Sequence, residues 1–66
     1  MEFDIGTTAG HIWQYLDRHG AVTSLKLKSA LGISNSVLYL ALGWLAREDK
    51  IEIAAHDHTY RISLKG

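Results

Sequence analysis

The amino-acid sequence predicts a small α+β domain, with three helices, a short strand after the first helix, and a β-hairpin at the C-terminal end. Two patterns support this prediction. Apolar residues recur at helical spacing in three segments, each preceded by a Ser or Thr that can cap a helix. Two later segments alternate apolar and polar residues, as half-buried strands do. With 66 residues and no cysteine, the domain must gain its stability from tight packing or from oligomerisation.

The N-terminal part of the chain is expected to contain an extended segment and the first helix. In residues 1–8, polar and apolar side chains alternate before a glycine interrupts the pattern, which is typical of a short strand or of an ordered tail. Thr7 or Thr8 can then cap a helix that runs to about His19, and Gly20 is a natural stop for it. The predicted core residues of this helix are Ile12 and Leu16.

A pair of helices joined by a short turn is predicted in the middle of the chain. After a brief β-like piece at residues 21–23, Thr23 or Ser24 caps a second helix from Leu25 to Leu31. A glycine ends this helix, and Ser34 can cap a third helix directly afterwards. Such a short connection is typical of a helix-turn-helix. The third helix is predicted to bury Leu38, Ala41, Leu42 and Leu45.

The opposite side of the third helix is also apolar. Val37, Leu40 and Trp44 recur there at helical spacing, and no charged residue occurs between residues 32 and 46. A helix that is apolar on two sides has to be covered on both. Gly43 costs about 1 kcal/mol relative to alanine in the middle of a helix, and it leaves a notch where a neighbour can approach closely.

Two explanations of this apolar surface remain open. In the first, Trp44 packs against the hairpin or against Phe3 and Ile5, and completes the core of its own chain. In the second, another molecule covers the surface; a second copy of the chain is the simplest candidate, which predicts a homodimer. The sequence leaves open whether Phe3 and Ile5 pack within the chain or across a dimer. The expected interface residues are Val37, Tyr39, Leu40, Gly43 and Trp44.

The C-terminal part of the chain is predicted to form the hairpin. Asp49 follows the third helix at a position where a left-handed residue is often needed. Residues 55–58 are predicted to form the turn between two strands. The alternating apolar positions of these strands are Ile51, Ile53, Tyr60, Ile62 and Leu64.

The order of these elements and the local sequence resemble the winged helix-turn-helix domain. HIWQYLDRHGAVTSLKLKSALGIS is similar to the first half of such domains, and VLYLALGWLAREDKIEI is similar to a recognition helix leading into the first wing strand. The likeness extends from Gly10 to Leu64 and is greatest to a small stand-alone prokaryotic winged-helix family of unknown function. It implies a winged-helix domain over residues 9–64 and an association with DNA or transcription.

The resemblance implies that the third helix enters the major groove while the second helix and the hairpin contact the DNA backbone. The residues implied for nucleic-acid binding are Lys26, Lys28, Ser34, Asn35, Ser36, Tyr39 and Arg61. The composition argues against strong binding, because seven basic and seven acidic residues cancel and the pI is near 6.9. In the third helix only Asn35 is of a base-reading type before Arg47. We therefore expect weak, salt-sensitive binding of duplex DNA by each copy.

These observations favour a non-enzymatic winged helix-turn-helix module that forms a homodimer and binds DNA. The alternative hypothesis is a protein-interaction adaptor that docks a protein partner on the apolar face of the third helix and has no DNA role. The sequence contains no glycine-rich phosphate loop and no nucleophile elbow, so no catalysis and no cofactor are expected.

The remaining sequence signals are weaker. His56 and His58 flank Asp57, but zinc needs three or four ligands, so we expect no metal site. The longest apolar run is about half of the roughly 20 residues that span a bilayer, and no membrane role is expected. Glu2 and Asp4 stand where a signal peptide would be basic, which favours a cytoplasmic location.

Overall fold

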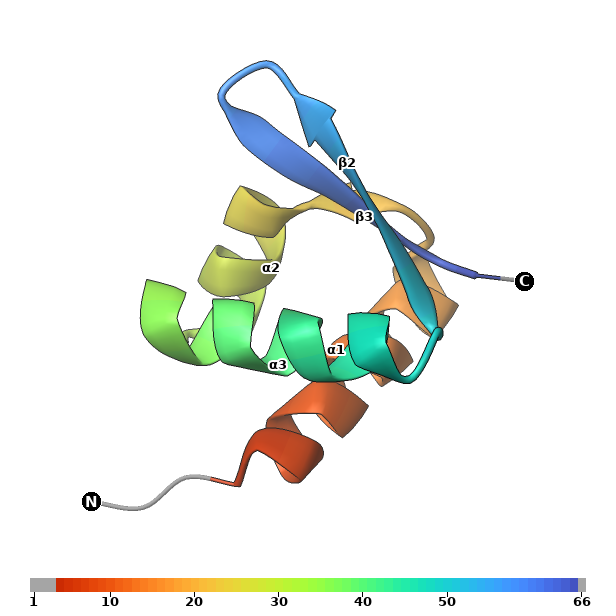
Figure 1. Cartoon of the computed structure of the whole chain (residues 1–66). Helices are drawn as coiled ribbons and strands as arrows, with labels where there is room; N and C mark the ends of the chain where they lie inside the picture. Colours follow the sequence, from red (N-terminus) through yellow and green to blue (C-terminus); the bar gives the residue numbers. More distant parts are fainter. Residues whose placement is uncertain (1–3, 66) are drawn as a thin grey trace.

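The computed structural model describes residues 4–65, and the predicted α+β fold is confirmed in it (Figure 1). Three helices are followed by a hairpin, and a short strand separates the first two helices. The elements are α1 Ile5–His19, β1 Val22–Thr23, α2 Ser24–Leu31, α3 Asn35–Arg47, β2 Ile51–His56 and β3 Thr59–Leu64.

The start of α1 differs from the prediction, because Asp4 caps the helix and neither Thr7 nor Thr8 does so. The Asp4 carboxylate accepts hydrogen bonds from the backbone N–H of Gly6 at 2.9 Å and from the Thr7 hydroxyl at 2.9 Å. The Thr7 hydroxyl, with the backbone N–H groups of Thr7 and Gly6, therefore lowers the pKa of Asp4 below its usual value of 3.8. Residues 5–8 are helical and not extended, and Ile5 packs against the core. The rest of the predicted extended segment, including Phe3, lies outside the described residues.

The helix-turn-helix forms as predicted, with each boundary set by a local signal. Thr23 caps α2 by accepting a hydrogen bond from the Lys26 backbone N–H at 3.1 Å. Gly32 ends α2 in the left-handed conformation, with φ of 63°, which costs glycine little. Ser34 then caps α3. The two helices meet at 116°, within the usual range for this motif.

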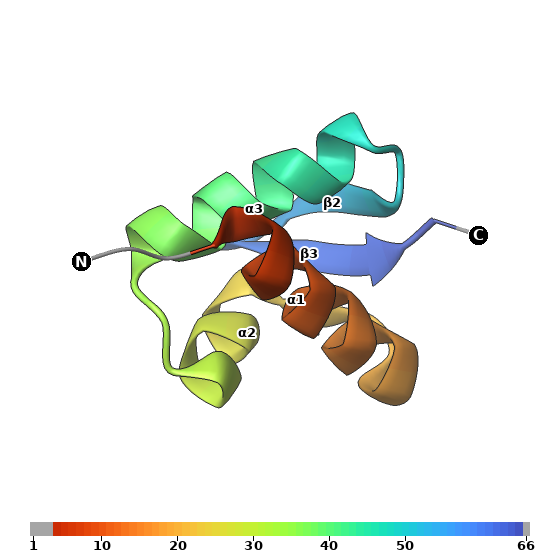
Figure 2. The same cartoon turned by 90° about the horizontal axis from the view of Figure 1, so that it is seen from below.

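The core lies between the three helices and the sheet, and Figure 2 shows α1 crossing beneath α3 and β3. The predicted inner faces of α1 and α3 are confirmed as buried. Each element contributes to the same cluster, which explains how so short a chain encloses a core. The buried apolar residues are Ala9, Ile12, Leu16, Leu27, Leu38, Ala41, Leu42, Leu45, Ile51 and Ile62.

The sheet is antiparallel, with β3 in the centre between β1 and β2. Asp49 has a left-handed φ of 61°, as predicted, and accepts a hydrogen bond from the Lys65 ammonium at 2.6 Å, which raises the pKa of Lys65. The hairpin turn is shorter than predicted, because His56 pairs with Thr59 and only residues 57–58 lie between the strands. The hairpin tip projects beyond the helices (Figure 1). Ile53 is exposed and not half-buried, although its partner Ile62 in the central strand is fully buried, because β2 is an edge strand.

In the described part of the chain, no single helix has the length and apolar character needed to cross a membrane; α2 and α3 meet that test only when taken together as a bent pair.

Candidate functional site

The exposed surface of α3 is divided into two flanks. At 3.6 residues per turn, each residue advances about 100° around the helix, which places Asn35 and Trp44 about 180° apart. Tyr39 lies on the same side as Asn35, whereas Leu40 and Val37 lie on the side of Trp44. Asn35 and Tyr39 therefore lie on one flank and Val37, Leu40 and Trp44 on the other, whereas Ser36 and Gly43 fall between the two, at about 100° and about 80° from Asn35.

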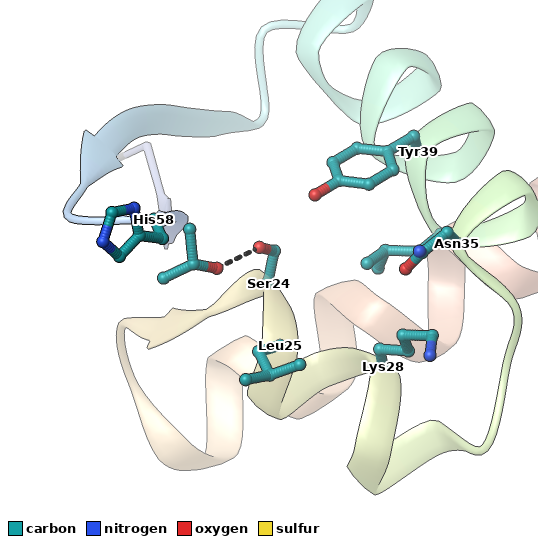
Figure 3. A pocket seen from close by; sticks show the side chains of 8 residues that line it. Ser24, Leu25, Lys28, Asn35, Tyr39 and His58 are labelled. Carbon is teal, nitrogen blue, oxygen red and sulfur yellow. Dashed lines mark hydrogen bonds between the residues drawn. The ribbon is translucent and has the colours of Figure 1, made fainter.

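The first flank, here called the wing flank, borders an open hollow of about 160 Å³ between α2, α3 and the hairpin tip (Figure 3). Three of the predicted nucleic-acid residues meet there, because Lys28 comes from α2 while Asn35 and Tyr39 come from the first half of α3. In Figure 3 the Tyr39 hydroxyl points across the hollow toward Ser24. The lining residues are Ser24, Leu25, Lys28, Asn35, Leu38, Tyr39, His58 and Thr59.

Three contacts at or beside this hollow hold the hairpin against the helices. The hydroxyls of Ser24 and Thr59 are 2.7 Å apart, and the Tyr60 backbone N–H donates to the Ser24 hydroxyl at 3.3 Å. The rings of Tyr39 and Tyr60 meet edge to face, with centroids 6.2 Å apart and planes at 83°. Such pairs contribute about 0.5–1.5 kcal/mol beyond their buried area. The position of the wing relative to α3 is therefore fixed by the chain itself.

The other predicted nucleic-acid residues do not line the hollow. The Ser34 hydroxyl is used as the cap of α3, where it accepts a backbone N–H at 3.2 Å. Ser36 and Lys26 are exposed on the first turns of α3 and α2. Arg61 precedes the fully buried Ile62 in β3, and because neighbouring strand residues point to opposite faces, Arg61 faces away from the helices.

Sequence reasoning missed four of the lining residues, Ser24, Leu25, His58 and Thr59. His58 is an exposed residue of the hairpin turn, as predicted, and it lines the hollow because the turn lies beside α2. Ser24 and Thr59 are 35 positions apart, and only the folded register brings their hydroxyls together. The one available signal was Ser24, which directly follows Thr23. Because Thr23 caps α2, the Ser24 hydroxyl is available for a hydrogen bond to a neighbouring element.

The second flank, here called the apolar flank, consists of Val37, Leu40 and Trp44. Leu40 is 50% exposed and Trp44 is 48% exposed, whereas Val37 is partly buried. The hairpin does not bury Trp44, and Phe3 lies outside the described residues. A Cβ atom added at Gly43 would meet nothing within 4 Å, so packing within residues 4–65 does not explain the glycine. Within residues 4–65, Leu40 and Trp44 of the apolar flank therefore remain about half exposed.

A second hollow, of about 240 Å³, lies along α1 and has a structural explanation. Its basic residues, Arg18 and His19, occupy the last turn of α1, where positive charge complements the negative end of the helix dipole. Tyr15 and His19 stack with ring centroids 4.3 Å apart. No group of three His, Asp or Glu residues suited to a metal occurs within residues 4–65.

This geometry is that of a winged helix-turn-helix domain, in which a solvent-exposed third helix stands beside a hairpin wing. The chain belongs to the family described as winged helix-turn-helix domain (DUF2582), whose model matches residues 1–64. The resemblance inferred from the sequence is thereby confirmed. Domains of this fold typically bind DNA and are non-enzymatic.

The chain is 40% identical over 65 residues to the uncharacterized protein MJ1608 of Methanocaldococcus jannaschii, and the match covers 92% of this chain and 90% of that protein. No solved structure matches the chain. Because almost the full length of both proteins is covered, the likeness includes the helices and the wing alike.

Proposed function

We propose that this chain is a non-enzymatic, cytoplasmic DNA-binding module associated with transcription, which binds duplex DNA weakly through the wing flank and forms a homodimer through the apolar flank. The observation that supports this proposal most is the division of α3. Asn35 and Tyr39 lie with Lys28 beside the wing, while Leu40 and Trp44 lie on the other side of the helix. The two activities therefore do not compete for the same surface.

The wing flank has the arrangement that DNA contact requires, with few charges. Lys26 and Lys28 on α2 are available for phosphates, and Asn35 and Ser36 stand at the start of α3 where base edges would lie. Phosphate contacts supply most of the affinity of non-specific binding, and each adds roughly one counterion to the salt dependence. Two lysines predict a shallow salt dependence and low affinity for each copy.

The apolar flank supports self-association. A chain with no net charge does not repel its own copy, and half-exposed Leu40 and Trp44 would gain from burial against the same residues of a second chain. A two-fold interface uses each residue twice, so a small patch contributes double. Two copies would also present two wing flanks to one duplex, which compensates for weak binding by each.

The test of DNA binding is fluorescence anisotropy with a labelled mixed-sequence duplex between about 50 and about 200 mM salt. Lys28→Ala is expected to weaken binding and to reduce the slope of log affinity against log salt by about one. Lys50→Ala is the matched control, because it removes the same charge from an exposed lysine that follows the far end of α3. Absence of binding at the lowest salt, or equal loss in both variants, would refute DNA binding through the wing flank.

The second candidate function is a protein-interaction adaptor without a DNA role. It is favoured by the exposed Trp44 and the open backbone at Gly43, because Trp often dominates binding energy and a glycine permits close approach. Three results together would establish this function in place of the first. The chain would be monomeric in solution, it would not bind DNA, and Trp44→Ala would abolish its binding to a protein partner.

A further inference from the structure

The hairpin gives the sheet an open edge along β2. One side of β2 bonds to the central strand β3, and its other side pairs with no strand within residues 4–65. Every residue of β2 after Ile51 is exposed, and the hairpin tip extends beyond the helices (Figure 1). Lysine, proline and bulges protect many edges of this kind, and β2 contains none of the three. The edge can therefore accept another extended chain.

The backbone of β2 presents its free hydrogen-bonding groups on alternate residues. The Lys65 backbone N–H donates at 2.9 Å to the carbonyl of Lys50, which lies opposite it in the register. Because hydrogen-bonded and non-hydrogen-bonded pairs alternate along an antiparallel ladder, residues 52, 54 and 56 bond to β3. Ile53 and Ala55 then direct their N–H and C=O groups to the open edge. This spacing matches the repeat of an extended peptide and not that of a helix.

The side chains beside this edge form an apolar strip. Ile53 pairs with the buried Ile62, so the side chains of Ile53 and Ala55 lie on the face of the sheet toward the helices. Tyr60 lies opposite Ala55 on the same face. Ile53 and Tyr60 are each 44% exposed, so the core does not cover this part of the face. A strand with apolar residues at alternate positions would bury both side chains.

The open edge is also acidic. Residues 48–57 contain four acidic residues and one lysine, in a chain with no net charge. Asp49 pairs with Lys65 at 2.6 Å. Glu52, on β2 itself, forms no salt bridge with Arg61 of β3 or with any other residue among 4–65. A second copy would bring the same acidic segment against this edge, whereas a basic chain complements it.

We propose that the open edge of β2 binds an extended basic segment of a partner protein, which joins the sheet as a further strand. The backbone of this segment bonds to Ile53 and Ala55, and its apolar side chains cover Ile53 and Tyr60. Its lysine or arginine residues lie on the other face of the sheet, near Glu52. β2 contributes to neither the wing flank nor the apolar flank, so this contact is independent of the proposed function.

The test uses a short acetylated peptide of alternating valine and lysine, added to the ¹⁵N-labelled chain, with a peptide of alternating valine and glutamate as the charge control. Only the basic peptide is expected to bind. Binding should slow hydrogen exchange at the N–H groups of Ile53 and Ala55, whereas those of residues 52, 54 and 56 already bond to β3 and should change little. Equal binding of both peptides, or binding without added protection at Ile53 and Ala55, would overturn the proposal.

Two variants test the backbone of the edge and its charge separately. Ala55→Pro removes an N–H that points to the open edge, where an edge strand tolerates proline, and should abolish peptide binding. Glu52→Gln should weaken binding roughly twofold to fivefold. Asp17→Asn removes the same charge from the exposed surface of α1 and should leave the affinity unchanged. If circular dichroism shows that Ala55→Pro does not fold, the two carboxylate variants decide, and equal loss in both contradicts the site.

The same measurements separate this contact from self-association and from DNA binding. Protection of Ile53 and Ala55 that rises with the concentration of the chain alone would show a second copy on the edge, and so refute a peptide partner. Lys28→Ala, which tests DNA binding, should not change the peptide affinity. DNA binding without peptide binding excludes the edge site and leaves the proposed function standing, and peptide binding without DNA binding does the reverse.

Discussion

Replacing Trp44 with alanine is expected to convert the proposed homodimer into monomers. A Trp side chain buries up to roughly 250 Å², so its exposure of 48% leaves about 100 Å² to be covered by a partner. At about 25 cal/mol per Å², covering that area contributes about 2.5 kcal/mol for each copy. A two-fold interface uses the residue twice, which gives about 5 kcal/mol and a rise in the dimer Kd on the order of a thousandfold or more.

Sedimentation equilibrium over a range of protein concentrations measures this change directly. Leu25→Ala is the matched control, because Leu25 is 68% exposed on α2 and lies outside the apolar flank. It should leave the dimer Kd unchanged. Alanine is the best helix former, and Trp44 is only half-buried, so the variant should keep the helical circular dichroism of the wild-type chain.

Two results would refute the reasoning. A wild-type chain that remains monomeric at the highest concentration would show that the exposed Trp44 does not mark a self-association surface. A dimer that Leu25→Ala dissociates as readily as Trp44→Ala would place the interface on another surface of the domain.

Three further predictions concern stability and packing. Ile62→Ala removes a fully buried side chain from the central strand and should cost about 2–5 kcal/mol, which a urea titration will show as a large loss of stability. Asp4→Asn keeps a capping oxygen but removes the titration of the carboxylate. Because hydrogen bonds lower the pKa of Asp4 in the folded chain, the stability it contributes is complete above its usual pKa of 3.8 and is lost as the pH falls through the lowered pKa. Thermal unfolding measured down to acidic pH should therefore decline less for Asp4→Asn than for the wild-type chain. Gly43→Ala meets no clash within the chain and should stabilise the monomer by about 1 kcal/mol, whereas it should weaken a dimer in which the partner approaches this backbone; urea titration and sedimentation measure the two effects.

Local signals in the sequence predicted most of the fold correctly. Gly20, Gly32, Ser34 and Asp49 each set a boundary through their own backbone preference or side-chain hydrogen bond, without help from distant residues. The error at the N-terminal end has the same kind of cause. Alternation in the first residues resembled a strand, but the Asp4 carboxylate accepts hydrogen bonds from the first N–H groups of a helix, so the N-cap of α1 lies three residues before Thr7.

The hollow could be predicted only in part. Lys28, Asn35 and Tyr39 followed from the expected position of the helix-turn-helix relative to DNA. Ser24 and Thr59 did not, because their contact depends on the register between β1, β2 and β3 and on the length of the hairpin turn. The sequence pattern Ala-His-Asp-His resembled a four-residue turn, which ended the first strand of the hairpin two residues before His56, where β2 ends in the structure.

The proposed homodimer would also account for the absence of charge in α3 before Arg47. A charged residue on the apolar flank would have to be desolvated when a second copy covers it, at a cost that an unpaired ion does not recover. On the proposed wing-flank surface, Asn35 and Tyr39 would contact the duplex without adding charge, so each copy is expected to bind weakly. Under the proposed function, the two properties are thermodynamically linked. If a duplex engages both copies together, DNA must raise the apparent dimer affinity by the same factor by which dimerisation raises the affinity for DNA. Trp44→Ala should therefore weaken DNA binding without touching the wing flank, and the salt dependence of the remaining binding should approach that of a single copy.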